Sequence, residues 1–275
     1  MSSASFFISP QELWSRIGTS DAPLILDVCR REIYEAGPGV IPTAQWHKPE
    51  TYAEWVPGLP TDRPIVLACR YGHNLSQMIA AELRGRGVPA QVLEGGRQAW
   101  SEAGLPVVNK AVLERFAPKP PSLWVTRRRP KIDRVACPWL IRRFIDPQAR
   151  ILYVDPAEVK NIADDIGAIP FDIEGIEISH EGDRCSFDTM LKLFGLEGDP
   201  HLARVALIVR GADTARPDLA PEAAGLHAIS LGLSALAGDD DHAMIERGFM
   251  VYDALFAWSR YAAEERHNWP AKAAA

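Results

Sequence analysis

The chain has 275 residues, of which 47% are apolar and 24% are charged, a balance typical of globular proteins. This length is sufficient for two domains that each have a core of their own. The formal net charge of −6 and a pI near 5.7 argue against nucleic acid or an anionic membrane as a general partner.

The cysteine content and the hydropathy pattern indicate the compartment. Four cysteines occur without paired spacing, which favours reduced thiols over a disulfide framework. Residues 1–10 lack a basic start followed by an apolar run, so they do not have the pattern of a secretory signal. No stretch approaches the roughly 18 apolar residues that a membrane helix needs. We therefore expect a cytoplasmic protein with no membrane partner.

The first predicted elements alternate between short apolar strands and helices. Leu24–Asp27 and Ile65–Ala68 are β-rich runs, and Gln77–Arg84 carries apolar residues at helical spacing before Gly85. Asp27 ends the first strand. We expect its carboxylate to accept hydrogen bonds from loop amides rather than to act as a general base.

Cys69 lies where the second strand passes into the following helix. Loop amides converge on such a position and the positive end of the helix favours an anion, so the thiolate gains stability relative to the thiol. This arrangement predicts a nucleophile at neutral pH. The alternative is a buried cysteine that acts as a small apolar residue. Cys29 could serve as a resolving thiol if the fold brings the two sulfur atoms together.

Four ordered segments around Cys69 resemble a rhodanese domain, the single-domain sulfurtransferase module. The first is a strand with its turn (Leu24–Arg31), and the second is an Ile-Pro segment (Gly39–Trp46). The third is an active loop (Cys69–Ser76), and the fourth is a glycine turn before a tryptophan helix (Leu93–Trp100). The likeness spans residues 8–108. It implies an α/β domain with a central parallel sheet flanked by helices. It also implies a persulfide on Cys69, a small anionic sulfur donor, a thiol acceptor and no required cofactor.

The resemblance also implies which residues bind the donor. These are the residues of the active loop together with an arginine after the first strand, namely Arg70, Tyr71, Gly72, His73, Asn74, Leu75, Ser76 and Arg31. Arg70 and His73 would orient the donor. Asn74 stands where the family usually has a second arginine, so thiosulfate would be held by one cation fewer. Phosphatases of this fold need an arginine at the place of Leu75, so phosphate ester hydrolysis is disfavoured.

A break in composition separates the two halves of the chain. Pro106–Pro121 contains the break, and its Ala117–Ser122 part cannot continue a helix. We therefore expect domains at residues 1–108 and 123–275, joined by a linker at residues 109–122 whose Ala117–Ser122 part is extended.

The second half mixes strands and helices before it becomes helical throughout. The pattern predicts strands at Leu123–Thr126, Arg150–Val154, Ala168–Ile173 and Ile176–Ser179, and helices at Pro156–Ile166, His201–Arg210, Pro221–Leu236 and Asp240–Tyr261. A helix is expected to begin near Cys137–Pro138, because proline suits a first helical position. Ser186 is the expected cap of a helix over Phe187–Phe194. These elements predict an α+β domain that ends in a helical bundle.

A second candidate site combines cations and thiols of this half. Its members are Arg127, Arg128, Arg134, Cys137, His180 and Cys185. The arginines before the Cys137 helix suit an oxyanion, although a charge run is also typical of a solvated face. His180 and Cys185 are expected at the same sheet edge. A metal site, a thiol or anion pocket, and purely structural roles all stay open, because the spacing matches no standard zinc pattern.

This half resembles the C-terminal domain of ChrB, a family of chromate-resistance proteins, over about residues 123–262. The likeness is carried by Lys131–Asp146, Phe171–Asp172, His180–Phe187 and Arg210–Thr214. A rhodanese module before such a domain is a known arrangement. The resemblance implies one of two functions. The first is sulfur transfer that acts in chromate resistance or detoxification. The second is a regulator or accessory protein of chromate export that binds chromate or senses redox state, with a rhodanese module that is not catalytic. DNA is disfavoured as a partner by the acidic charge and the lack of a helix-turn-helix pattern.

Overall fold

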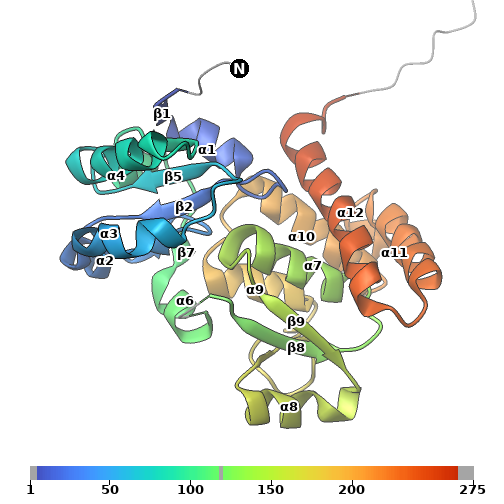
Figure 1. Cartoon of the computed structure of the whole chain (residues 1–275). Helices are drawn as coiled ribbons and strands as arrows, with labels where there is room; N and C mark the ends of the chain where they lie inside the picture. Colours follow the sequence, from blue (N-terminus) through green and yellow to red (C-terminus); the bar gives the residue numbers. More distant parts are fainter. Residues whose placement is uncertain (1–4, 118–119, 266–275) are drawn as a thin grey trace, which may run out of the picture.

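The structure is a computed structural model that describes residues 5–117 and 120–265. It is built around two parallel sheets (Figure 1). The first sheet has the strand order β1-β6-β5-β2-β4. Its strands are β1 (Phe7–Ile8), β2 (Leu24–Asp27), β4 (Gln45–Trp46), β5 (Ile65–Ala68) and β6 (Ala90–Leu93). β2 and β5 are buried along their whole length. Parallel strands that are covered on both faces are expected to be continuously apolar, and these two are.

Helices flank the first sheet, as the resemblance implied (Figure 1). They are α1 (Pro10–Arg16), α2 (Arg31–Ala36), α3 (Tyr52–Trp55), α4 (Asn74–Gly85) and α5 (Gly96–Glu102). The side chain of Ser9 caps α1 by accepting a hydrogen bond from the backbone N–H of Glu12. α4 begins three residues before the predicted Gln77, so the end of the Cys69 loop forms its first turn.

Regular secondary structure occupies the first half of the predicted linker at residues 109–122. β7 (Val108–Asn109) pairs antiparallel with β3 (Gly39–Val40), and α6 (Lys110–Phe116) follows. Asn109 starts this helix because its side chain accepts hydrogen bonds from the backbone N–H groups of the first turn. Residues 118 and 119 of the predicted linker lie outside the described residues.

The second sheet has three parallel strands in the order β10-β8-β9. They are β8 (Leu123–Arg127), β9 (Arg150–Val154) and β10 (Ile169–Pro170), and α8 (Val159–Ile166) connects the last two. Around them lie α7 (Asp133–Leu140), α9 (Ser186–Phe194), α10 (Pro200–Asp213), α11 (Ala223–Ala237) and α12 (Asp241–Tyr261). The helix-rich C-terminal region was predicted. None of the described helices is both long and apolar enough to cross a membrane.

Three local predictions for the second half are wrong. Residues 176–179 form no strand, although Asp172 N–H donates to the carbonyl oxygen of Ile178. α7 begins at Asp133, so Pro138 lies inside the helix, and a π-helical turn at Ile141–Ile145 continues it. The cap of α9 is Cys185, one residue before the predicted Ser186, because Asp188 completes a capping box with its backbone N–H.

The two halves share one apolar core. Trp14 of α1 lies 6.2 Å from the ring of Phe144, measured between ring centroids. The backbone N–H of Thr43 donates to the carbonyl oxygen of Phe144 over 3.1 Å. Arg260 of α12 donates to the carbonyl oxygen of Ile17 over 3.1 Å and stacks over the Trp14 ring. The first and last helices of the chain are therefore joined directly.

Candidate functional site

Cys69 directly follows β5, and its loop runs into the first turn of α4. Its Sγ lies 3.2 Å from Ser76 Oγ and 3.7 Å from the carbonyl oxygen of His73. The residue is only 7% exposed. The sulfur atom is thus held at the base of the loop by polar atoms of the helix that follows.

The backbone of this loop offers unused hydrogen-bond donors. Within the described part of the chain, the N–H groups of residues 70–76 donate no hydrogen bond. Those at the start of α4 have no intrahelical acceptor, as is general for a first helical turn. Unbonded N–H groups and the positive end of a helix together favour an anion. The loop therefore has the properties of an anion cradle beside a thiol.

A glycine turn before α5 holds the Cys69 loop in position. The N–H groups of Arg97 and Gln98 donate to the carbonyl oxygens of Cys69 and Arg70 over 2.9 and 3.0 Å. A Cβ atom on Gly96 would clash with the Cys69 carbonyl oxygen. The two backbones approach closely because this position has no side chain.

The predicted donor-binding side chains of the loop are mostly at the surface. Arg70, Tyr71, His73 and Asn74 are exposed, and the Arg70 guanidinium stacks on the Tyr71 ring at 4.8 Å. Leu75 is half-buried, and Gly72 turns the backbone at a φ of +69°. The loop thus presents a cation and an imidazole to solvent above a buried thiol.

Arg31 does not join this loop. Its guanidinium pairs with Glu35 one turn further along α2, at 2.6 Å, and both side chains are exposed. The arginine that supports the site is Arg97 of α5, which sequence reasoning missed. The signal was its place directly after the glycine turn.

Arg97 pairs with Asp27, a buried carboxylate that is the last residue of β2. Its Nη1 lies 2.8 Å from Asp27 Oδ2, and Asp27 Oδ1 accepts the N–H of Cys29 over 3.0 Å. Asp27 therefore accepts a loop amide, as predicted. Burial, followed by the charge of Asp27, raises the pKa of Cys29 to about 12. This thiol stays protonated at neutral pH, so the environment of Cys29 does not suit a resolving nucleophile.

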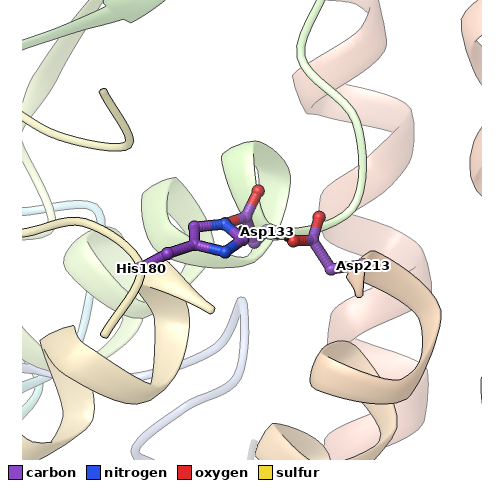
Figure 2. Close-up of side chains that lie close together, drawn as sticks. All are labelled: Asp133, His180 and Asp213. Atoms are coloured by element: carbon purple, nitrogen blue, oxygen red, sulfur yellow. Dashed lines mark ion pairs between the residues drawn. The ribbon is translucent and has the colours of Figure 1, made fainter. Parts of the chain in front are cut away.

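A second polar cluster lies in the second half. Asp133 at the start of α7, His180 in an irregular segment and Asp213 at the end of α10 point toward one another (Figure 2). His180 Nε2 lies 3.3 Å from Asp133 Oδ2, 3.3 Å from Asp213 Oδ2 and 3.5 Å from Asp172 Oδ1. Sequence reasoning named His180 but missed Asp133 and Asp213. Both are part of the segments that carried the ChrB resemblance.

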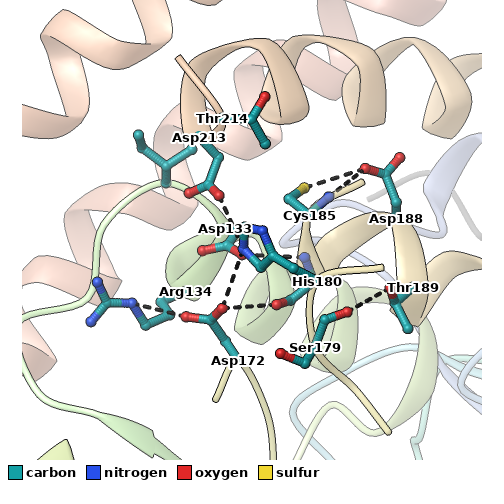
Figure 3. A network of polar contacts seen from close by, with 12 residues as sticks. Asp133, Arg134, Asp172, Ser179, His180, Cys185, Asp188, Thr189, Asp213 and Thr214 are labelled. Carbon is teal, nitrogen blue, oxygen red and sulfur yellow. Dashed lines mark hydrogen bonds and ion pairs between the residues drawn. The ribbon is translucent and has the colours of Figure 1, made fainter. Parts of the chain in front are cut away.

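The arginines of the predicted oxyanion site face carboxylates (Figure 3 shows Arg134). Arg127 Nη2 and Arg134 Nε lie 2.7 and 3.1 Å from Asp172 Oδ2. Arg128 pairs with exposed Asp155 at 2.9 Å. These contacts do not favour an oxyanion site, because the cations already have anionic partners and the cluster that they border is acidic.

The two thiols of this half are fully buried. Burial raises the pKa of both Cys137 and Cys185 well above the usual range, and nearby carboxylates add to this effect. Cys185 Sγ donates to Asp188 Oδ2 over 3.4 Å (Figure 3). Asp188 also pairs with Arg210. Protonated, buried thiols are poor nucleophiles, so these contacts do not favour a thiol-based sensor.

Charge within the Asp133 cluster is only partly balanced. Burial, followed by the charge of Asp133, raises the pKa of Asp213 to about 8. The pKa of Asp172 is raised for the same two reasons. A hydrogen bond to Asp133 is the largest cause of a raised pKa at His180. The three carboxylates crowd one imidazole, and two of them, Asp133 and Asp172, are almost fully buried.

Family comparisons agree with this architecture. The fold and the cysteine loop define the first part as a rhodanese-like domain, and residues 9–103 match that family. Residues 124–259 match a second family, described as ChrB, C-terminal domain. The chain therefore contains a rhodanese-like domain followed by a ChrB C-terminal domain.

Individual relatives match one half or the other. Protein ChrB of Cupriavidus metallidurans is 41% identical over 133 residues, which is 48% of this chain and 39% of that protein. A rhodanese-related protein from Thermoplasma volcanium is 26% identical, with a TM-score of 0.32, over 38% of this chain and 98% of that chain. Thiosulfate sulfurtransferase from Pseudomonas aeruginosa is 27% identical, with a TM-score of 0.32, over 40% of this chain and 20% of that chain.

Proposed function

We propose that the protein is a sulfurtransferase that forms a persulfide on Cys69 and acts in chromate resistance or detoxification. The observation that carries the proposal is the Cys69 loop, where the N–H groups of residues 70–76 are unbonded around a thiol. The rhodanese-like domain supports the sulfur chemistry. The ChrB C-terminal domain supports the link to chromate.

The reaction proceeds in two displacements. The Cys69 thiolate attacks the outer sulfur of an anionic donor such as thiosulfate, the S–S bond of the donor breaks, and sulfite leaves with the electron pair. The new Cys69 persulfide carries its negative charge on the outer sulfur, which the free N–H groups of the loop stabilise. An acceptor thiolate then attacks that outer sulfur, and the Cys69 thiolate is released.

The side chains around the loop bind and orient the donor. Arg70 and His73 are exposed at the loop and attract the anion. Ser76 Oγ lies within hydrogen-bond distance of the Cys69 sulfur, at 3.2 Å, and its hydroxyl donates to the carbonyl oxygen of His73 over 3.0 Å. The loop has no arginine at Asn74, so binding of the donor depends mainly on backbone groups.

A Cys69→Ser variant tests the chemistry. Sulfur transfer from thiosulfate to cyanide or to a dithiol is expected to fall to the uncatalysed rate, because a hydroxyl cannot form the persulfide. Mass spectrometry of the wild type after thiosulfate treatment should show one added sulfur on the Cys69 peptide. Cys29→Ser is the matched control in the same domain and should retain the transfer. Undiminished activity of Cys69→Ser contradicts the proposal.

The physiological role needs a separate measurement. A chromate-sensitive host that expresses the wild type should survive higher chromate concentrations than one that expresses Cys69→Ser at equal abundance. Equal protection by both would show that sulfur transfer at Cys69 does not contribute to resistance.

A further inference from the structure

The cluster around His180 has more acceptors than its hydrogen bonds can satisfy. His180 Nε2 lies between 3.3 and 3.5 Å from an oxygen of each of Asp133, Asp172 and Asp213. One N–H group cannot donate to three carboxylates in three directions. If Nε2 carries no hydrogen, its lone pair faces the lone pairs of three oxygens. A positive centre among these atoms resolves this second conflict, because it is attracted by the lone pairs of Nε2 and of the oxygens.

The surrounding cations do not supply that centre. Among the described residues, Arg127 and Arg134 pair with Asp172, and no arginine or lysine pairs with Asp133 or Asp213. Asp133 is almost fully buried, so water cannot screen its charge. Apart from His180, these two carboxylates have no cationic partner in the described chain.

The distances from His180 to the two aspartates match the spacing of ligand atoms around a metal ion. The ligand atoms of Asp133, His180 and Asp213 lie within 4.8 Å of one another. A tetrahedral ion with bonds of about 2.1 Å separates its ligand atoms by ~3.4 Å. The contacts from His180 Nε2 to Asp133 and Asp213, both 3.3 Å, are close to that spacing.

Neighbouring contacts orient Asp133 and Asp172. The Ser186 N–H donates to Asp133 Oδ2 over 3.3 Å, and the Ser186 hydroxyl donates to Asp172 Oδ1 over 2.8 Å. Arg127 and Arg134 hold the other oxygen of Asp172. Such outer contacts orient the ligands of a metal site. The His180 side chain is 43% exposed, so an ion can enter from solvent.

We infer that Asp133, His180 and Asp213 form a binding site for a divalent first-row transition metal ion. One imidazole nitrogen and two carboxylate oxygens suit ions such as Mn²⁺ and Zn²⁺. Asp172 Oδ1 lies 3.5 Å from His180 Nε2, and its other oxygen pairs with Arg127 and Arg134. The site is separate from the Cys69 loop and does not depend on the proposed sulfur transfer.

Metal titration of the full chain tests the inference without an activity assay. Protein freed of metal by a chelator is titrated with Mn²⁺, and the electron paramagnetic resonance signal of free Mn²⁺ is followed. Zn²⁺ is titrated separately by calorimetry. Wild type is expected to bind one equivalent, and a chelator is expected to lower its melting temperature. Asp213→Asn and His180→Gln should each weaken binding at least about 10-fold, since each removes one ligand.

Controls separate ligation from folding and from general acidity. Glu181→Gln removes an exposed carboxylate next to His180 that pairs with Lys192, and it should bind metal like the wild type. Circular dichroism shows whether each variant is folded, and His180→Gln is the variant expected to disturb the core least. The inference is overturned if wild type shows no saturable binding of either ion at millimolar concentration. It is also overturned if folded His180→Gln binds as tightly as wild type.

Discussion

The four cysteines differ in their surroundings although the sequence placed each near the end of a strand or helix. Cys29, Cys137 and Cys185 are at most 1% exposed, whereas Cys69 is 7% exposed and borders the loop that opens to solvent. The pKa of each of the three buried thiols is raised, mainly because burial disfavours the charged form. We therefore expect reactivity to be concentrated on the Cys69 sulfur atom.

Thiol labelling tests this difference. At mildly alkaline pH, iodoacetamide is expected to modify one cysteine of the folded wild type, at Cys69, and none in Cys69→Ser. Cys29 should stay unmodified because a pKa of about 12 leaves it protonated until strongly alkaline pH. Peptide mass spectrometry identifies the labelled residue. Labelling of Cys29 at a rate similar to Cys69 would contradict this account of the two sites.

Sequence reasoning at the residue scale succeeded where the partner is close in the chain. Asp27 accepts the N–H of Cys29, two residues away, as predicted. It missed Arg97, the ion-pair partner of Asp27, because the two lie 70 residues apart and only the fold of the sheet brings them together. The partners of His180 were missed for the same reason.

At the element scale, the Cys69 loop depends on the turn between β6 and α5. Gly95 and Gly96 both have positive φ, and Gly96 also lies against the carbonyl oxygen of Cys69. The glycine pair was noticed in the sequence as part of the rhodanese resemblance. The close approach that requires it became visible only once the turn and the loop were placed together.

Gly96→Ala tests this packing. The substitution is expected to destabilise the protein by roughly 2–4 kcal/mol and to lower sulfur transfer, because strained φ and a backbone clash both act on the loop. Gly104→Ala is the matched control, with a φ of +64° against +60° and no atom near the added Cβ. It should cost only about 1 kcal/mol. Denaturant unfolding measures both, and equal costs would show that the close approach contributes nothing.

At the scale of the whole molecule, the interface between the two halves is apolar and continuous with the core. Phe144 is fully buried and contacts Trp14 of the first domain as well as Trp139 and Phe256 of the second. The Gly18 position lies directly against the Phe144 and Phe256 rings. Such an interface couples the stability of the two domains.

Phe144→Ala is expected to lower the free energy of unfolding by about 3–5 kcal/mol, because it leaves a cavity in the shared core. Both domains should unfold in one transition, followed by circular dichroism and tryptophan fluorescence. Leu236→Ala, at a side chain that is 76% exposed, is the control and should change stability little. Two separate transitions, with only the later domain shifted, would contradict this coupling.

The sequence by itself determined the bounds of several strands, most of the described helices and the place of the Cys69 loop. β2, β5 and β9 have the predicted bounds because continuous apolar runs and their flanking turns are local signals. The loop around Cys69 was recognised for the same reason. Its pattern lies within eight consecutive residues, Cys69–Ser76.

Only the tertiary structure decided which charges meet. The arginines of β8 and α7 were a candidate oxyanion site, with a solvated face as the alternative, but the fold places Arg127 and Arg134 on Asp172. It also brings Asp133, His180 and Asp213 together from positions far apart in the chain. Electrostatic interactions depend on distance and burial, and the linear order of residues specifies neither.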